Sequence, residues 1–446
     1  MSRAIRSVAV LGGGIVALSA AAAFARALPG VAVTLIETPV DPAALADRLP
    51  GSTSAIHRFH AAIGIEEAAL IRSGAALPRL GLRFENWPGE AWVHVHGDHG
   101  VPESNPPFHQ LWARARQAGQ AEAYHLYAAA GVIAEAGKFV HPQSRPPLSG
   151  FDYALRLDLE RCRAALAAHG DRLGVRRSGG RLAGIERRDD VGIAALRLDD
   201  GRRVEADLFV DAAGPAALLL SALDPAFEDW ALPFDRLSFD AATGGALDPN
   251  DTLTASETGW QWRAPFPDRT LAGSVGTGEI ALRAGRRPRP WIGNVLAIGD
   301  AAVALDPLHW LPLHLAHSAI LRALDLLPGR DCAPIELAEY NRRAAAEDAC
   351  AHDFVAVHYR RWGVALPPVL EQFCSRGRFV ARDEDGLDRE TWLAALFGLG
   401  LLPRAIDPLA AAVPEQAAVA GLRRFAEGLA GIPAQLPPFG EYLARR

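Results

Sequence analysis

A short strand, a run of three glycines and an alanine-rich helix stand at the start of the chain, and they constrain its fold more than any other feature. Residues 7–11 form an apolar strand pattern, and residues 15–28 form a helical one. Between them, the pattern G-x-G-x-x-G/A falls on Gly12, Gly14 and Ala17. The first glycine permits a tight turn, the second lets backbone approach a pyrophosphate, and the small third residue lets helix and strand pack closely. This spacing predicts a Rossmann-like dinucleotide-binding unit in an α/β fold.

The same segment predicts which residues contact the dinucleotide. The phosphates are expected at the helix N-terminus, where free N–H groups and the helix dipole favour negative charge. A second apolar strand, residues 31–36, ends at Glu37, where an acid is placed to accept a hydrogen bond from a ribose hydroxyl. The predicted cofactor-binding residues here are Gly12, Gly13, Gly14, Ile15, Val16, Ala17 and Glu37.

Two later strand patterns indicate that the dinucleotide is FAD. Residues 208–214 (LFVDAAG) and 294–302 (NVLAIGDAA) are apolar runs that end in small residues and an aspartate. Many FAD proteins return to the nucleotide with such strands. We therefore predict that Asp211, Gly214, Gly299 and Asp300 also bind the cofactor, although Asp300 alone also suits a helix N-cap. No second glycine fingerprint followed by an acid is present, so no separate nicotinamide-binding domain is expected.

Composition excludes several other classes of protein. The 446 residues allow two or three domains, and the net charge of −6 is unsuited to phosphate neutralisation on nucleic acid. No uninterrupted apolar run reaches the length of a membrane span. The four cysteines lie far apart, without disulfide-like or metal-like spacing, which favours a reducing, cytoplasmic location.

Several further motifs occur in a recognisable order. Residues 259–265 read GWQWRAP, close to a GWxWxIP signature, and residues 337–361 contain EYNR followed by VHY. Gly398, Leu399, Gly400 and Pro403 are similar to a GQGxxP segment. With these motifs, nearly the whole chain resembles the flavin-dependent tryptophan halogenase family.

The resemblance implies a glutathione-reductase-like FAD module with a mainly helical substrate-binding part. It also implies that a separate flavin reductase supplies reduced FAD through transient contact. In this family, reduced flavin and O2 oxidise a halide, a lysine relays the oxidant to an aromatic substrate, and a Thr–Gly pair holds the halide. The substrate class is an aromatic small molecule, indole- or tryptophan-like, or a peptide-bound aromatic. A homodimer is left open.

The predicted FAD module is discontinuous and comprises residues 1–87, 151–220 and 287–327. Residues 88–150, 221–286 and 328–446 are assigned to the substrate-binding part. Within the module, alternating apolar and polar residues over 181–206 predict a small antiparallel ribbon.

The family lysine corresponds to Arg79 here. The family segment resembles KLGIRFEDW, and residues 79–87 read RLGLRFENW. Guanidinium stays protonated and offers fixed donors, so Arg79 is expected to orient an oxidant or an anionic substrate rather than react with halogen. Lys138 is the one lysine of the chain, and it falls in a different segment.

The halide loop is also changed. The family's EPLESTG corresponds to residues 306–312, DPLHWLP, so the acid becomes His309 and the Thr–Gly pair becomes Leu311–Pro312. Pro312 has no N–H to donate to an anion, whereas His309 is suited to act as a base near neutral pH. The G-E-x-T loop reads GSTS at residues 51–54. These replacements argue against standard halogenation, and they leave halide binding open.

Two other readings of the flavin chemistry remain open. Trp260 and Trp262 stand in the signature thought to keep substrate from the flavin, and core packing is their alternative role. A reshaped loop at Leu311–Pro312 would favour direct oxygen transfer by a monooxygenase. A non-catalytic FAD-binding paralogue with an accessory role is the other alternative.

A histidine cluster lies outside these motifs. His94 and His96 share one face of a predicted strand, and His99 follows the turn. Three imidazoles suit a metal, but a polar strand face or a histidine-lined substrate cleft explains them as well. We predict that His94 and His96 contact substrate and that no metal is bound.

Overall fold

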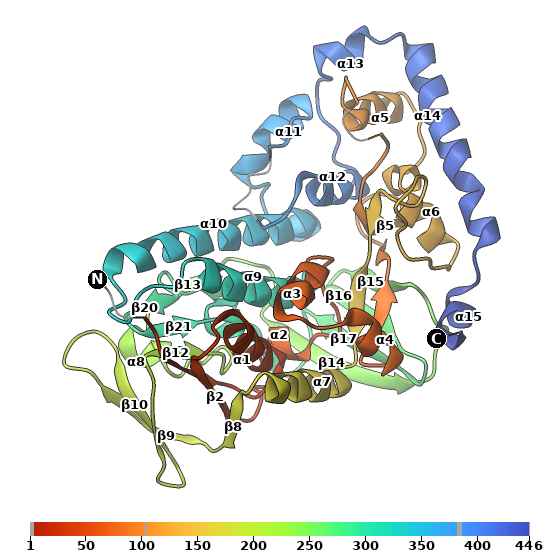
Figure 1. The fold of residues 1–446 in the computed structure, drawn as a ribbon. Coiled ribbons are helices and arrows are strands. Elements are labelled where there is room, and N and C mark those ends of the chain that lie inside the picture. Colours follow the sequence, from red (N-terminus) through yellow and green to blue (C-terminus); the bar gives the residue numbers. More distant parts are fainter. Residues whose placement is uncertain (1–3, 102–103, 381–385, 446) are drawn as a thin grey trace. The chain divides into compact units, whose positions relative to one another are not determined.

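The computed structural model describes residues 4–101, 104–380 and 386–445, and the chain divides into two compact units. The first unit consists of Met1–Leu77, Arg156–Ala231 and Ile280–His352. The second consists of Pro78–Leu155, Leu232–Glu279 and Asp353–Arg446. Each unit is therefore assembled from three separated segments, which Figure 1 follows by colour.

The first unit is built on a six-stranded sheet with the order β20-β21-β12-β1-β2-β8. All its neighbours are parallel except β20 and β21. The bounds are β1 Ser7–Leu11, β2 Ala32–Glu37, β8 Arg176–Gly179, β12 Leu208–Asp211, β20 Trp291–Ile292 and β21 Val295–Ala297. Leu11 lies beside Ile36 on one side and Asp211 on the other. The register thus brings the carboxyl ends of three strands together, where α/β sheets bind ligands.

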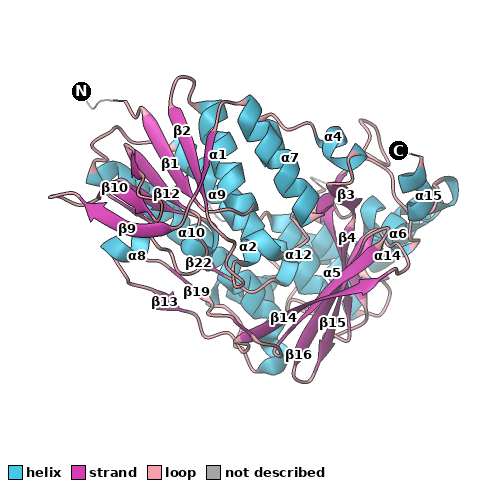
Figure 2. Ribbon diagram, turned by 90° about the horizontal axis from the view of Figure 1, so that it is seen from below, coloured by secondary structure: helices cyan, strands magenta, loops and turns pink. Residues whose placement is uncertain are grey.

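Helices pack on this sheet, among them α1 (Figure 2). Ten of the thirteen residues of α1 are buried. The bounds in the first unit are α1 Ile15–Ala27, α2 Leu45–Arg48, α3 Ile56–Ile63, α4 Glu67–Arg72, α7 Leu159–Arg172, α8 Leu220–Leu223, α9 Leu311–Asp325, η2 Gly299–Ala301 and η3 Leu308–Trp310. Ala20, Ala21, Ala22 and Ala23 of α1 are all buried. These small side chains let α1 pack against both α7 and α9.

Smaller sheets complete the first unit. The predicted ribbon is confirmed as β9 Leu182–Arg187, β10 Ile193–Leu198 and β11 Arg203–Glu205, which pair antiparallel. A second three-stranded sheet joins β13 Glu228–Asp229, β19 Gly285–Arg286 and β22 Val303–Ala304. The strands β3 Ala76–Arg79 and β7 Ala154–Leu157 form a pair, and the unit boundary falls inside both.

The third segment of the first unit extends beyond the predicted boundary at residue 327. It continues into α10 (Pro334–His358), which ends in the second unit. Asn341 of α10 accepts a hydrogen bond from the backbone N–H of Trp291 at 3.0 Å and donates one to its carbonyl oxygen at 3.0 Å. The ring of Tyr340 packs edge-on against that of Trp291. These contacts attach the first half of α10 to the edge of the FAD-type sheet, a pairing that motif spacing does not reveal.

The second unit combines helices with a large sheet, whereas the sequence predicted mainly helices. Its strands follow the order β14-β17-β16-β15-β4-β5-β6. The bounds are β4 Gly81–Glu85, β5 Trp92–Gly97, β6 Phe151–Asp152, β14 Arg236–Thr243, β15 Asn250–Ser256, β16 Gly259–Pro265 and β17 Arg269–Val275, and β18 Ile280–Ala281 adjoins the unit boundary. Alternating burial along β16 shows why the sheet forms, because one face of the GWQWRAP segment is apolar.

The helices of the second unit come mainly from the C-terminal third of the chain. They are α5 Phe108–Gln117, α6 Ala129–Glu135, α11 Glu371–Arg376, α12 Arg389–Gly398, α13 Pro408–Ala412, α14 Glu415–Ala430 and α15 Phe439–Ala444. The short 3-10 helices are η1 Tyr124–Tyr127, η4 Tyr359–Trp362, η5 Pro368–Leu370 and η7 Ile432–Gln435. No helix within the described ranges is both long and apolar enough to cross a membrane.

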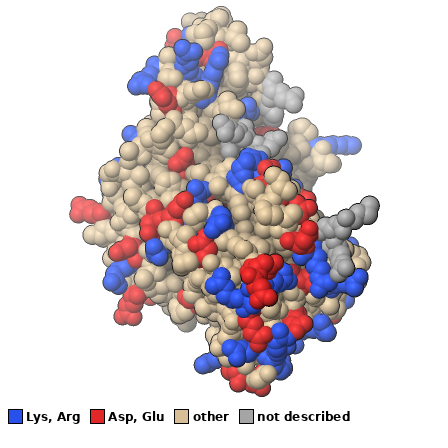
Figure 3. Space-filling view, turned by 90° about the vertical axis from the view of Figure 1, so that its left-hand side faces the viewer, with Lys and Arg blue, Asp and Glu red and all other residues tan. Residues whose placement is uncertain are grey.

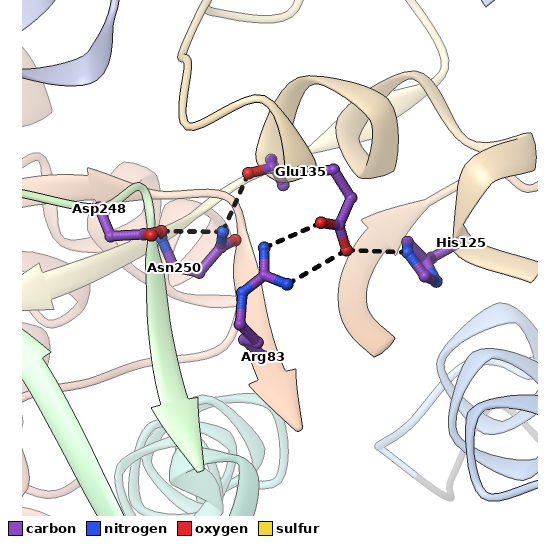
Figure 4. A network of polar contacts seen from close by, with 6 residues as sticks. Arg83, His125, Glu135, Asp248 and Asn250 are labelled. Atoms are coloured by element: carbon purple, nitrogen blue, oxygen red, sulfur yellow. Dashed lines mark hydrogen bonds and ion pairs between the residues drawn. The ribbon is translucent and has the colours of Figure 1, made fainter. Parts of the chain in front are cut away.

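A polar network joins the sheet of the second unit to its helices (Figure 4). Arg83 of β4 makes two hydrogen bonds to Glu135 of α6, at 3.3 and 3.1 Å. His125 of η1 contacts the same carboxylate at 3.0 Å. Asn250 of β15 donates to the carbonyl oxygen of Ala134 at 3.2 Å and to Asp248 at 2.9 Å. The hydrogen bond from His125, followed by those from Arg83, lowers the pKa of Glu135 to about 2.

Charged side chains of both signs lie close together on the face shown in Figure 3. Many are paired, as in the ion pairs Arg283–Asp229 and Arg203–Glu186 of the first unit. Such exposed pairs contribute little to the free energy of unfolding, so the stability of each unit rests on its core.

We expect Glu135→Gln to lower the free energy of unfolding at pH 7 by about 1 kcal/mol, since the carboxylate is partly exposed and its pairs are screened. The folded-state pKa lies below the ordinary value of 4.5, so this stabilisation is present above pH 4.5 and is lost as the pH falls toward 2. Urea unfolding at pH 7 and pH 3 measures both effects. Glu441→Gln, in an exposed pair with Arg445, is the control, and an equal loss in both variants would contradict the prediction.

Candidate functional site

The glycine turn after β1 admits no side chain at its first two positions. Gly12 has φ +149°, and a Cβ on it would lie 2.4 Å from the carbonyl oxygen of Ala212 and 2.9 Å from the Cβ of Ala17. A Cβ on Gly13 would lie 2.0 Å from the carbonyl oxygen of Thr38. Both distances are below any real Cβ contact, so glycine is required for packing alone. The strand, turn and helix predicted from sequence are confirmed at these positions.

A carboxylate that the sequence analysis missed lies at the N-terminus of α1. Asp47 of α2 accepts a hydrogen bond from the backbone N–H of Val16 at 2.8 Å. Gly14 is the N-cap of α1, and a Cβ there would lie 2.1 Å from the Asp47 carboxyl group. Burial raises the pKa of Asp47 to about 6, although the Val16 N–H and Arg163 oppose the shift. No sequence signal marks Asp47, because it follows Val16 by 31 residues and belongs to a four-residue helix.

Asp300 supplies a second buried carboxylate beside the same turn. Its Oδ2 accepts a hydrogen bond from the N–H of Ala46 at 2.9 Å. Its Oδ1 is buried and has no hydrogen-bond partner among the residues that the structure describes. Gly299, at φ +58°, packs against Val16 of α1, with 3.1 Å between an added Cβ and Cγ1. Burial raises the pKa of Asp300 to about 7.

Asp211 and Glu37 occupy the carboxyl ends of β12 and β2, but both are already engaged. Asp211 accepts hydrogen bonds from the N–H groups of Leu219 at 2.7 Å, Leu220 at 3.0 Å and Ala213 at 3.2 Å. Those contacts close its own loop and support a structural role. Glu37 pairs with Arg177, whose Nη2 lies 2.7 Å from Oε1. A ribose hydroxyl would share Glu37 with this arginine.

These residues fit an FAD dinucleotide. The side-chain-free turn, the first N–H groups of α1 and the acid at the end of β2 match the requirements of a pyrophosphate and a ribose. The unpaired oxygen of Asp300 is the feature that the chain's own contacts leave unexplained, and a hydroxyl of the cofactor would satisfy it.

In the second unit, Arg79 is fully buried and paired. Its Nε lies 3.2 Å from Oδ2 of Asp251, which is also fully buried, and its Nη1 donates to the carbonyl oxygen of Gly81 at 3.0 Å. Asp251 enters through β15, which pairs in parallel with β4. Arg79 is the last residue of β3, and the chain that follows it runs beside the start of β15, where the N–H of Leu80 donates to the carbonyl oxygen of Pro249 at 2.8 Å.

The predicted substrate residues lie on two parts of the second unit. Trp260 and Trp262 are buried on one face of β16, and Trp260 donates from Nε1 to the hydroxyl of Tyr359 at 2.8 Å. This placement favours core packing for both tryptophans. His94 and His96 of β5 have ring centroids 5.9 Å apart. Burial, and then the neighbouring histidines, lower the pKa of His94, so its ring is neutral.

Beside β5, the second unit has a pocket. Its aromatic walls include Trp92, Trp112, Tyr124 and Phe397, together with His99 and His125. The rings of His99 and Tyr124 stack at 4.6 Å. Three buried polar atoms in these walls, Trp92 Nε1, His99 Nε2 and Tyr124 OH, have no hydrogen-bond partner within the described part of the chain. Burial lowers the pKa of His99 to about 3, so it is neutral. No group of three or more His, Cys, Asp or Glu placed to hold a metal occurs among the described residues.

Comparison with known proteins decides the family. The tryptophan halogenase family model matches residues 7–279 and 276–415. The chain is 24% identical to tryptophan 7-halogenase RebH from Lentzea aerocolonigenes, over 93% of each protein. BrvH, a flavin-dependent halogenase from Brevundimonas sp. BAL3, is 30% identical with a TM-score of 0.92, covering 99% of this chain and 100% of that one. Xcc4156, a flavin-dependent halogenase from Xanthomonas campestris, is 28% identical with a TM-score of 0.90, covering 99% and 98%.

The chain belongs to the tryptophan halogenase family. The predicted α/β class with an FAD-binding Rossmann-type module is confirmed with it. In this tryptophan halogenase family member, the position that the resemblance assigns to the catalytic lysine carries the buried Arg79–Asp251 pair. Lys138 does not replace that lysine, because its Nζ donates to the carbonyl oxygen of Pro433 at 2.6 Å and ties down the C-terminal segment.

The family's halide loop is rebuilt in this tryptophan halogenase homologue. His309 and Trp310 have φ of 57° and 59°, a left-handed conformation that side chains rarely adopt. Both are buried, and α9 begins directly after them with Leu311 and Pro312. Proline suits the first turn of a helix, but it removes one N–H that an anion would need.

Trp310 also fills space beside the loop that corresponds to the family's G-E-x-T segment. A Cβ on Gly51 would lie 2.3 Å from Cδ1 of the Trp310 indole. Thr53 of that loop contacts Nδ1 of His314 on α9 at 3.2 Å. The rebuilt loop is therefore an integral part of the first unit, where an indole replaces the small serine of the family.

We expect Asp251→Asn to lower the free energy of unfolding by about 3 kcal/mol, because it leaves the buried Arg79 guanidinium without its counter-charge. Replacing both residues by leucine is expected to cost less than the Asp251 variant alone. Chemical denaturation of the single and double variants measures the coupling. Asp240→Asn, on an exposed strand position, is the control, and a cost equal to that of the control would show that the pair contributes nothing.

Proposed function

We propose that the first unit binds FAD and that reduced flavin with O2 oxidises an aromatic substrate held by the second unit. The observation that carries the cofactor assignment is the unpaired, buried Oδ1 of Asp300 beside a glycine turn that admits no side chain. The turn and the N-terminus of α1 would hold the pyrophosphate, with Gly12, Gly13, Gly14, Ile15 and Val16 supplying backbone. Glu37 and Asp300 would accept hydrogen bonds from hydroxyl groups.

Reduced flavin would come from a separate reductase. The sequence has no second glycine fingerprint for a nicotinamide cofactor, so the electrons need an external source. All four cysteines are thiols rather than disulfides, which supports a reducing compartment such as the cytoplasm.

When bound and reduced, FAD supplies the activation of O2, and the chain's residues decide what happens to the oxidant. No lysine amine is available at the position of Arg79, and a guanidinium does not lose its proton to become a nucleophile. Arg79 is assigned as a positioning residue that links the end of β3 to Asp251 of β15. His309 is the group that we assign as base in the rebuilt loop.

Direct oxygen transfer is the second candidate reaction. Two features favour it. The Arg79–Asp251 pair stands where the family has the lysine that carries the halogen, and Pro312 lacks the N–H that would hold the halide. A monooxygenase needs neither. Halide oxidation without the lysine would still release free hypohalous acid, which would halogenate electron-rich aromatics with little regiochemical control.

The pocket beside β5 supports an aromatic substrate and refines its class. Ring walls favour a planar ligand. The Trp92 indole N–H can only donate, so the ligand needs a hydrogen-bond acceptor, whereas His99 and Tyr124 can donate or accept. We assign this pocket to a planar aromatic that carries a carbonyl or hydroxyl oxygen, free or at the end of a peptide. His94 and His96 lie on β5 together with Trp92, but neither is among the residues that line the pocket.

The test is turnover with a flavin reductase, NADH, FAD and a panel of indoles and phenols, with and without bromide. Product in which oxygen has been added in halide-free buffer is expected if oxygen transfer is direct. Brominated product would instead show that the Arg79 position tolerates halogenation. Formation of peroxide alone, with every substrate, would support the non-catalytic paralogue and refute the enzyme assignment.

Arg79→Lys alone is expected to leave chlorination negligible, because the donor lost at Pro312 remains lost and Asp251 retains the new amine. Chlorinated indole is quantified by mass spectrometry, with Arg83→Lys on the following strand, β4, as the control. Robust chlorination by Arg79→Lys would overturn the argument about the anion site.

A further inference from the structure

The helix N-terminus that the proposed function assigns to the FAD pyrophosphate already carries a charged side chain. The Asp47 carboxyl accepts the N–H of Val16 at 2.8 Å and fills the space over Gly14. The helix dipole and the free N–H groups of the first turn make this position attractive to any anion. Asp47 and a pyrophosphate therefore compete for the same donors.

Asp47 is held there by a very short helix. The N–H of Ala46, at the start of α2, is bonded to Asp300, so α2 extends from one cofactor-facing carboxylate to the N-terminus of α1. The helix is only one turn long, Leu45–Arg48, and its residues Leu45, Ala46 and Asp47 are buried. Withdrawing Asp47 from α1 requires this single turn to rearrange.

We propose that Asp47 is a proton-dependent competitor of the flavin pyrophosphate, and that FAD binds by displacing or protonating it. This inference rests on the proposed function, since it assumes that FAD binds at α1. Its consequence is that the affinity for FAD falls as the pH rises, because ionised Asp47 both holds the N–H groups and repels the phosphates. The protonated carboxyl does neither and can donate to a phosphate oxygen.

The charged neighbours of Asp47 set the direction of this effect. Arg163 of α7 attracts the carboxylate, and Asp300 of η2 repels it. Arg48 lies on α2 itself, and α9, which packs on α2, carries His314 and His317. Burial outweighs the attraction of Arg163 and the backbone hydrogen bonds and raises the pKa of Asp47 to about 6, so the carboxyl changes charge near that pH.

The experiment measures FAD binding to the full chain by flavin fluorescence between pH 5.5 and 8. For the wild type, the dissociation constant is expected to rise about 80-fold over this range, since one proton on a group with a pKa of about 6 is coupled to binding. ADP-ribose, which carries the diphosphate at constant charge but no flavin ring, should show the same rise. An equal rise with ADP-ribose would show that the pH dependence arises at the phosphates and not at the flavin ring.

Asp47→Asn keeps the side-chain acceptor for Val16 and removes the charge. The rise in its dissociation constant is expected to shrink to about threefold or less, with tighter binding than the wild type at pH 8. Asp41→Asn is the matched control, because the Asp41 carboxyl accepts the N–H of Ala43 at 2.7 Å rather than one at the start of α1, and this variant should keep the wild-type dependence. Asp47→Ser is a second neutral variant in case the asparagine disturbs folding.

Thermal unfolding of the flavin-free chain gives an independent readout. Since the folded-state pKa of Asp47 is raised, ionisation destabilises the fold, and stability is lost as the pH rises through the interval from 3.8 to about 6. The melting temperature of Asp47→Asn relative to wild type should therefore increase from pH 4 to pH 7.

The outcomes separate this inference from the proposed function. If the wild type and Asp47→Asn bind FAD with the same pH dependence, the competitor role is wrong and the FAD assignment stands. If neither the wild type nor any variant binds FAD or ADP-ribose at any pH, the proposed function fails and the inference fails with it.

Discussion

The close approach of backbone at Gly12 and Gly13 is the constraint on which the rest of the first unit depends. Carbonyl oxygens of Ala212 and Thr38 lie where side chains would otherwise be. Only this approach brings β1, β12 and α1 together tightly enough to aim the first N–H groups of the helix at a shared point. Asp47 accepts one of these N–H groups, and Asp300 accepts an N–H of the helix that carries Asp47. A site made of backbone donors and buried carboxylates selects a dinucleotide by shape and charge, and its affinity can depend on a single proton.

The second unit shows how a family position changes chemistry while the fold persists. An arginine at the lysine position could not be buried alone, because an unpaired charge is costly inside a protein. Asp251 on β15 supplies the counter-charge, and the pairing of β15 with β4, which begins two residues after Arg79, holds the two side chains close. The result is a stable ion pair without a reactive amine. The rebuilt loop at His309–Pro312 also loses a group needed for halogen chemistry. Pro312 lies in the first turn of α9 and has no N–H for an anion, and the buried Trp310 indole replaces a small serine.

Much of the fold followed from local patterns. The strand, turn and helix at residues 7–28, the acid ending β2 and the ribbon near residue 190 depend on neighbours in sequence, so their spacing was sufficient to predict them. The large sheet of the second unit was underestimated, because it is completed by the pairing of β15 with β4, whose residues lie far apart in the sequence. Asp47, Asp251 and the stacked His99–Tyr124 pair were missed for the same reason: each acquires its role from a partner that no motif places beside it.

The sequence by itself determined that the chain has a dinucleotide-binding turn and that it resembles the tryptophan halogenase family. It also determined that the family's catalytic lysine and halide-binding Thr–Gly pair are replaced by Arg79 and Leu311–Pro312. Those properties reside in residue type and spacing. Only the tertiary structure decided that Arg79 is paired with Asp251 and that Trp260 is hydrogen-bonded to Tyr359. It also decided that a carboxylate from a one-turn helix occupies the N-terminus of α1. Burial and long-range pairing set the charge and the partners of a side chain, and both are properties of the folded chain rather than of any segment.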